Sequence, residues 1–137
     1  MTAVSSAFAS TKPRQGLVIG VVPGHKDAEG IPSPPDGYPN PYVELAIRTH
    51  LPHSGERGED DLSRNHINIL TADVVVALPG SSGTASEVRL AAKYGKPIIC
   101  FVRREDKSEQ NAHFNLEGVV VVAHDFEEVK AFVLKHA

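Results

Sequence analysis

Two hydrophobic periodicities alternate along the chain. Short apolar or alternating runs predict strands, and apolar positions three or four residues apart predict amphipathic helices. The predicted strands span residues 16–22, 43–47, 73–78, 98–102 and 118–123. The predicted helices span residues 2–9, 61–71, 85–94 and 125–136. In the last helix, the apolar positions expected to face inward are Phe126, Val129, Phe132 and Val133.

Strands that alternate with helices predict an α/β fold. Because parallel strands are joined by right-handed crossovers through helices, the expected architecture is a Rossmann-like, doubly wound, mostly parallel sheet with helices on both faces. The length of 137 residues fits a single domain over 1–137. Ligands of such sheets bind at the carboxyl ends of the strands. Three segments follow such ends: 23–25, 79–84 and the residues after Val102.

Composition narrows the classes of partner. The formal net charge of −3 argues against a nucleic-acid-binding protein that works through a basic surface. The sequence contains no membrane-spanning run, and its first ten residues lack the pattern of a secretory signal. Cys100 is the single cysteine and lies in an apolar run, so we expect a buried, inert thiol and no disulfide framework. Together these features predict a cytoplasmic protein.

Three loops interrupt the periodic segments. Residues 25–40 contain four prolines and are predicted to lack regular structure. The loop at 50–60 contains His50 and His53, and the spacing of these two histidines resembles that of metal ligands. Because no third ligand is evident nearby, we predict no metal site. Residues 103–112 carry charges of both signs and are expected to form a solvated loop.

The segment 79–84, Pro-Gly-Ser-Ser-Gly-Thr, is the strongest candidate for a binding site. It joins a predicted buried strand to a helix predicted to begin at Ala85. Its glycines and serines allow a tight turn that directs successive N–H groups at an anion, and the helix N-terminus adds a partial positive charge. The segment therefore predicts a phosphate cradle, to which Ser82 and Thr84 could add hydroxyl donors.

The helix predicted at 61–71 supplies a second candidate. At 100° per residue, Arg64 and Asn65 fall on its polar face, whereas His66 falls on the apolar face with Leu62 and Leu70. A guanidinium is a planar fork that matches phosphate, and an amide both donates and accepts. The alternative is an ordinary solvated helix face. His66 is expected to be a packed core histidine.

Arg64 and the run Pro79-Gly80-x-x-Gly83-Thr84-x-x-Glu87 together resemble the signature of the "lonely guy" superfamily, also called SLOG and formerly mislabelled lysine decarboxylases. In that superfamily a Pro-Gly-Gly-x-Gly-Thr-x-x-Glu loop and an upstream arginine surround the phosphate and sugar of a nucleotide-like ligand. The resemblance extends over about residues 17–102. It implies a Rossmann-like fold and a small phosphorylated ligand.

Within the superfamily, the run Arg64-Asn65-His66-Ile67-Asn68 resembles the Arg-Asn-x-Ile-Asn helix of the molybdenum cofactor carrier branch. Cytokinin-activating phosphoribohydrolases have Arg-Lys there instead. Ser81 departs from the pattern, because it replaces the second glycine of the loop. The alignment also places Met1 at the end of a glycine-rich turn that precedes a helix. The chain is therefore expected to be an N-terminally truncated form of the fold.

Glu87 has two interpretations. Thr84 and Glu87 fit a capping box, in which the threonine hydroxyl caps the helix and the glutamate reaches back to its N–H. In phosphoribohydrolases, the resemblance implies instead that Arg64 and Glu87 stabilise an oxocarbenium-like ribose while the N-glycosidic bond breaks. That role requires a carboxylate at ribose distance.

Two functions remain open at this point. The first is a carrier that binds a phosphorylated nucleotide-like or pterin-like ligand, with the molybdenum cofactor as its cargo and no resident cofactor. The second is a nucleoside 5′-monophosphate phosphoribohydrolase with Arg64 and Glu87 as catalytic residues. The expected partner is a small phosphorylated ligand, and uncovered apolar surface on the strand at 17–22 predicts a homo-oligomer. The ligand-binding residues expected for either function are Pro23, Gly24, Arg64, Asn65, Pro79, Gly80, Ser81, Ser82, Gly83, Thr84 and Glu87.

Overall fold

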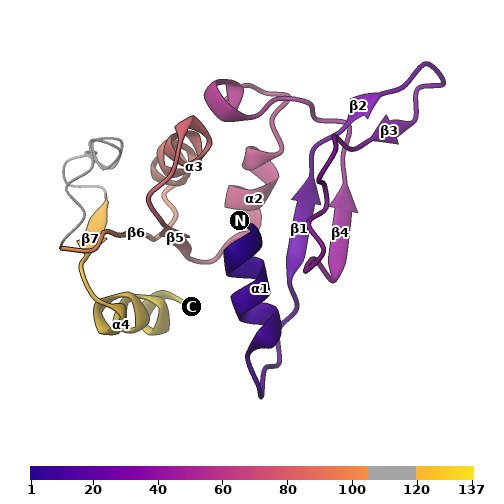
Figure 1. The fold of residues 1–137 in the computed structure, drawn as a ribbon. Coiled ribbons are helices and arrows are strands. Elements are labelled where there is room, and N and C mark those ends of the chain that lie inside the picture. The colour runs from indigo at the N-terminus through magenta and orange to yellow at the C-terminus, as the bar shows by residue number, and fades with distance from the viewer. Residues whose placement is uncertain (105–119) are drawn as a thin grey trace. The chain divides into compact units, whose positions relative to one another are not determined.

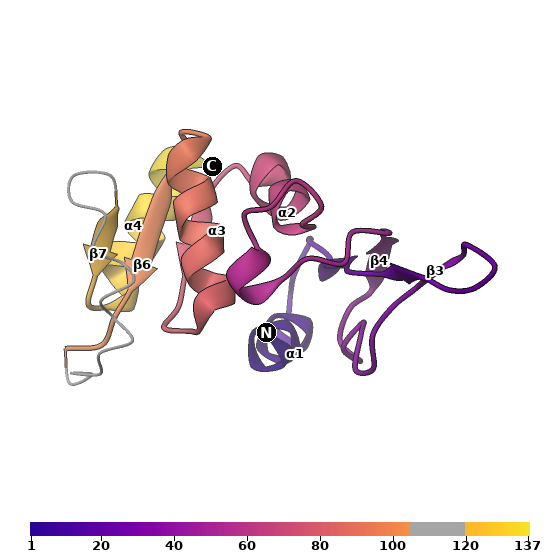
Figure 2. The same cartoon turned by 90° about the horizontal axis from the view of Figure 1, so that it is seen from above.

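The computed structural model describes residues 1–104 and 120–137 and has the predicted α/β fold (Figures 1 and 2). The chain divides into two compact units, unit 1 over Met1–Pro52 and unit 2 over His53–Ala137. None of the helices in the described ranges is long and apolar enough to cross a membrane. Most of the charged stretch at 103–112 lies outside the described residues.

Unit 1 contains α1 (Thr2–Ser10) and a parallel pair of strands, β1 (Ile19–Val22) and β4 (Leu45–Arg48). The register places Ile19 opposite Leu45. Strand β1 is shorter than the strand predicted at residues 16–22, and β4 is shifted towards the C-terminus relative to the strand predicted at residues 43–47. Both begin where their hydrogen-bonded pairing begins, with Ile19 opposite Leu45. The parallel pairing fits the predicted fold class.

An ion pair joins the segment before β1 to the residue before β4. The guanidinium of Arg14 donates to both carboxylate oxygens of Glu44, with N···O distances of 2.6 and 2.9 Å. Glu44 also accepts a hydrogen bond from the backbone N–H of Val18. The Arg14 and Val18 hydrogen bonds hold the pKa of Glu44 below its ordinary value. The interaction fixes where β4 begins relative to β1.

The loop predicted at 25–40 is partly ordered into an antiparallel pair, β2 (His25–Lys26) and β3 (Pro32–Ser33), so that prediction was wrong. The hairpin closes through Asp27, whose carboxylate accepts hydrogen bonds from the N–H groups of Glu29 and Ile31. Gly30 has φ = 79°, a conformation that favours glycine. An aspartate and a glycine at these positions are a turn signal that outweighed the prolines.

Unit 2 is built on a parallel sheet in the order β5 (Val75–Ala77), β6 (Ile98–Phe101), β7 (Val121–Ala123). The helices α3 (Ser82–Lys93) and α4 (Phe126–His136) lie on opposite faces of this sheet (Figure 1). Alternate residues of β6 point to opposite faces of the sheet. Ile98 and Cys100 belong to the cluster on the α3 side, whereas Ile99 and Phe101 pack with α4. The predicted helices on both faces are therefore present.

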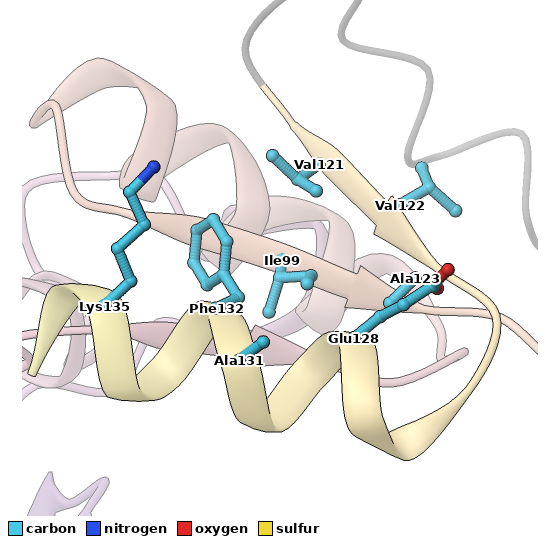
Figure 3. A pocket seen from close by; sticks show the side chains of 8 residues that line it. All are labelled: Ile99, Val121, Val122, Ala123, Glu128, Ala131, Phe132 and Lys135. Atoms are coloured by element: carbon cyan, nitrogen blue, oxygen red, sulfur yellow. The ribbon is translucent and has the colours of Figure 1, made fainter.

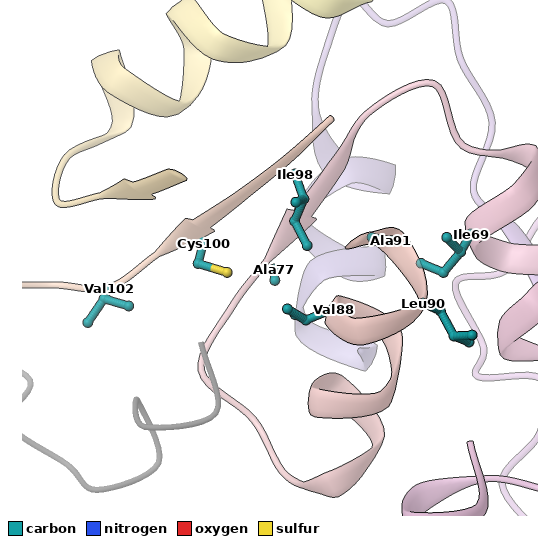
Figure 4. Packing of buried hydrophobic residues seen from close by; sticks show 8 residues of the cluster. All are labelled: Ile69, Ala77, Val88, Leu90, Ala91, Ile98, Cys100 and Val102. Atoms are coloured by element: carbon teal, nitrogen blue, oxygen red, sulfur yellow. The ribbon is translucent and has the colours of Figure 1, made fainter. Parts of the chain in front are cut away.

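The main core of unit 2 forms where α3 crosses β5 and β6 (Figure 4). Val88, Leu90 and Ala91 of α3 have no solvent exposure, and Ile69 is contributed by α2 (Asn65–Thr71). Cys100 is fully buried in this cluster, and its burial raises the thiol pKa to about 12. The predicted buried, inert thiol is confirmed.

The packing of α4 differs from the prediction at its first residue. Val129 and Phe132 pack against the sheet as expected. Phe126, in contrast, is 67 % exposed, although its ring stacks on Phe101 with 4.7 Å between centroids. The helix begins with Asp125 as its N-cap, which accepts from the N–H of Glu128. Phe126, the first residue of α4, therefore lies at the rim of the sheet rather than over it.

The expectation of a homo-oligomer rests on the exposed apolar side chains of β1 and β4. In unit 1, Ile19 is 56 % exposed and its register partner Leu45 is 49 % exposed. Parallel strands are normally covered on both faces. We expect light scattering to give a mass above that of one chain, and Ile19→Ser with Leu45→Ser to lower that mass. An unchanged monomeric mass in both proteins would contradict the expectation.

Candidate functional site

The candidate site lies where β5 ends and α3 begins. The helix starts at Ser82 rather than at the predicted Ala85, so Ser82, Gly83 and Thr84 form its first turn. Ser81 is the N-cap residue, but its side chain makes no capping hydrogen bond. The N–H groups of the first turn have no acceptor within the described part of the chain. Three parallel donors at the positive end of a helix dipole form an arrangement suited to an anion.

Gly80 is required by the packing of this turn. A Cβ atom at this position would clash with Oγ1 of Thr84 and would lie 2.9 Å from its Cβ atom. The Thr84 side chain therefore rests against the backbone of Gly80. This glycine has a structural role, because any larger residue would displace the first turn of α3.

Gly83 is in the opposite situation. A Cβ atom there would have only one neighbour within reach, the Cα atom of Gly55 at 4.0 Å. The position therefore has room for a Cβ atom as far as the protein itself is concerned. A requirement for glycine at residue 83 would come from whatever approaches the backbone from outside.

The predicted capping box of Thr84 and Glu87 is wrong. A capping box needs the threonine at the N-cap, but Thr84 is the third residue of α3 and Ser81 occupies the N-cap. Glu87 is instead half-buried and receives a hydrogen bond from the side chain of Asn68 on α2. Its carboxylate also lies within electrostatic reach of Arg64. The glutamate is therefore held between two helices.

The pKa of Glu87 is raised above its ordinary value, chiefly because burial removes water from the carboxylate. The positive charge of Arg64 and the hydrogen bond from Asn68 act in the opposite direction without cancelling the effect of burial. A carboxylate kept partly buried beside a cation is a common feature of functional sites.

Glu87→Gln tests this electrostatic picture. A raised folded-state pKa means that Glu87 favours folding below the ordinary pKa of 4.5, and that this contribution is lost as the pH rises through the folded-state value. The variant should therefore gain stability relative to the parent as the pH rises from 4.5 to neutral. Thermal unfolding across this range measures it, with Glu127→Gln on the exposed first turn of α4 as control. A variant that loses stability at neutral pH would contradict the account.

The helical wheel predicted that Arg64 and Asn65 face outward together, and this prediction was wrong. The helix α2 begins at Asn65 rather than Asp61, with Arg64 as its N-cap residue. Asn65 is only 3 % exposed and its N–H donates to Oγ of Ser63. The residues before it form turns instead of helix, so the predicted faces rotate and Leu62 is 49 % exposed.

The segment preceding α2 is a feature that sequence reasoning missed. Its short 3-10 helix, η1 (Gly55–Arg57), lies against α3, where Oγ of Ser86 donates to the carbonyl of Gly55 at 2.8 Å. A Cβ atom at Gly58 would lie 2.6 Å from Nδ2 of Asn65 and 2.7 Å from Cβ of Ser86. Two glycines three residues apart in a polar loop were the available signal of this close approach.

Pro23 and Gly24, the other predicted ligand-binding residues, lie at the end of β1 in unit 1 and are buried. The N–H of Gly24 donates to the carbonyl of Leu51 at 3.4 Å. A Cβ atom at Gly24 would clash with the carbonyl oxygen of Thr49. Packing within unit 1 is thus sufficient to explain a glycine here.

A pocket of about 400 Å³ lies elsewhere, between α4 and strands β6 and β7 (Figure 3). Its lining is mostly aliphatic and aromatic, with Glu128 and Lys135 as its charged residues. Lys135 is the single cation of this lining, and Glu128 adds a negative charge that disfavours an anion. Within the described ranges, no group of three or more His, Cys, Asp or Glu side chains is placed to hold a metal ion.

Comparison with known proteins identifies the family of the chain. The model of the SLOG cluster4 family matches residues 1–130, and the chain therefore belongs to that family. No curated protein matches the chain.

Two solved structures resemble the fold. One is the molybdenum cofactor binding protein from the phototrophic bacterium Rippkaea orientalis, with 31 % identity, a TM-score of 0.59 and coverage of 88 % of this chain and 63 % of that one. The other is the Moco carrier protein from Chlamydomonas reinhardtii, with 31 % identity, a TM-score of 0.55 and coverage of 88 % of this chain and 64 % of that one. The chain thus spans less than two thirds of the length of either protein.

Proposed function

We propose that this protein binds a phosphorylated, pterin-like ligand of the molybdenum cofactor type, as a carrier rather than as an enzyme. The observation that carries the proposal is the first turn of α3, in which the N–H groups of Ser82, Gly83 and Thr84 have no acceptor in the described part of the chain. The ligand's phosphate would accept from these donors. Ser81 and Pro79 would border it.

Arg64 supplies the positive charge in this proposal. It stands at the start of α2, within electrostatic reach of Glu87 on α3. A guanidinium beside a partly buried carboxylate is held in place by that charge and can present further N–H groups to a phosphate. The likeness to two molybdenum cofactor proteins supports the pterin-like identity of the ligand.

A second function, hydrolysis of a nucleoside 5′-monophosphate, is favoured by the proximity of Arg64 and Glu87. A phosphoribohydrolase requires an ionised carboxylate to stabilise positive charge on the ribose. In this chain, Asn68 donates to the Glu87 carboxylate and so occupies one of its acceptor positions. The likeness to two molybdenum cofactor proteins favours the carrier over the hydrolase.

Incubation with AMP separates the two functions. The carrier predicts no free adenine by liquid chromatography, whether the protein is the parent or Glu87→Gln. Adenine release by the parent that falls by about 100-fold or more in Glu87→Gln would overturn the carrier proposal, since loss of a charge-stabilising catalytic group has an effect of this size. Gly83→Val serves as the binding-site control.

A further inference from the structure

We propose that His66 is the positioning residue that holds the 54–60 segment against α3 and thereby sets how tightly the site closes on its ligand. The 54–60 segment comprises Ser54 to Asp60 and includes η1. The inference rests on the proposed function, because it concerns the same site. It assigns a role to a histidine that the sequence predicts only as a core residue.

The His66 side chain forms hydrogen bonds with two backbone carbonyl groups of this segment. Nε2 lies 3.1 Å from the carbonyl oxygen of Glu59 and 3.0 Å from that of Asp60. Carbonyl oxygens only accept, so Nε2 must carry a proton. Nδ1 lies 2.7 Å from the hydroxyl of Tyr94, at the other end of α3. In the neutral ring Nδ1 accepts from that hydroxyl, which fixes the tautomer.

The segment is fixed at two further points. The guanidinium of Arg89 pairs with the carboxylate of Glu59 at 2.7 Å, and Oγ of Ser86 donates to the carbonyl of Gly55. Both partners are on α3. The ion pair is exposed and contributes little, whereas His66 is half-buried and donates to backbone, so His66 is the stronger of the anchors at Glu59 and Asp60.

The place of the segment explains why its anchoring matters for binding. Gly55 faces the first turn of α3, with its Cα atom 4.0 Å from the Cβ position of Gly83. A phosphate held by the amides of that turn would therefore have the 54–60 segment as a neighbouring wall. Gly55 reaches this position with φ = 59°, which a residue with a side chain adopts only under strain.

His66→Leu, His66→Gln and His66→Asn form the test. The Gln amide nitrogen can replace Nε2 as the donor to the two carbonyls, whereas the shorter Asn amide replaces Nδ1 and cannot reach them. We expect His66→Leu and His66→Asn to speed hydrogen exchange of the Arg57, Gly58 and Asp60 amides, which donate within the segment. Affinity for molybdenum cofactor should fall about 3- to 10-fold, the range of one lost hydrogen bond. His66→Gln should restore both.

The outcomes distinguish this inference from the proposed function. Unchanged exchange and affinity in His66→Leu would overturn the role of His66 and leave the carrier standing. Faster exchange throughout unit 2, including the amides of α4, would show a merely structural role and also overturn it. Should His66→Leu fail to fold, Tyr94→Phe, which removes only the hydroxyl that orients the ring, must give the same local increase in smaller measure. Absence of cofactor binding by the parent protein would overturn the carrier itself, whereas cofactor binding that survives Gly83→Val would remove the first turn of α3 from the site.

Discussion

Gly83→Val should abolish the binding of molybdenum cofactor while the protein keeps its fold. A valine side chain would occupy the space in front of the first-turn amides of α3, where the proposed phosphate lies. The protein itself offers little resistance, because a Cβ atom at this position meets only the Cα atom of Gly55, at 4.0 Å. Binding measured by titration should weaken by at least about 100-fold, the equivalent of roughly two charge-assisted hydrogen bonds.

Gly80→Ala is the matched control. Its new Cβ atom would clash with Thr84, so this variant should lose stability as well as binding. Gly83→Val should instead melt close to the parent. Affinity that is unchanged in Gly83→Val would remove the first turn of α3 from the site, whereas unfolding of Gly83→Val would contradict the steric account.

Arg64→Met should weaken cofactor binding by about 10- to 150-fold, the range expected for one hydrogen bond to a charged group. The same substitution should raise the pKa of Glu87 further, because the charge of Arg64 lowers it in the parent. Cofactor titration gives the first effect, and the pH dependence of thermal unfolding gives the second.

Lys130→Met, on the exposed side of α4, removes the same charge at a distance from the site and should leave both properties unchanged. Equal losses of affinity in Arg64→Met and Lys130→Met would mean that net charge, rather than a specific contact, attracts the ligand. An unaltered pH profile in Arg64→Met would mean that Arg64 does not act on Glu87.

The sequence was informative where one local rule dominates. The β-branched run before Pro79 predicts β5, and the alternation of strands with helices predicts the parallel sheet of unit 2. Burial of Cys100 followed from the apolar run around it. In each case a short stretch of chain contains the cause of the structure.

Predictions failed where residues distant in sequence decide the outcome. The helical wheel placed Asn65 outward, but contact with Gly58 and the turns before α2 bury it. The capping box could be rejected only with the knowledge that α3 begins at Ser82, and this start depends on how Thr84 packs against Gly80. The 54–60 segment was missed because its role arises from contacts with α3, about thirty residues further along the chain.

The most direct test of the central claim is an anaerobic titration of the protein with molybdenum cofactor released from a molybdoenzyme. We predict saturable binding of one cofactor per chain, displaced by an excess of inorganic phosphate and absent in Gly83→Val. Absence of saturable binding by the parent protein, or binding that neither phosphate nor the substitution affects, would contradict a carrier that holds its ligand at the first turn of α3.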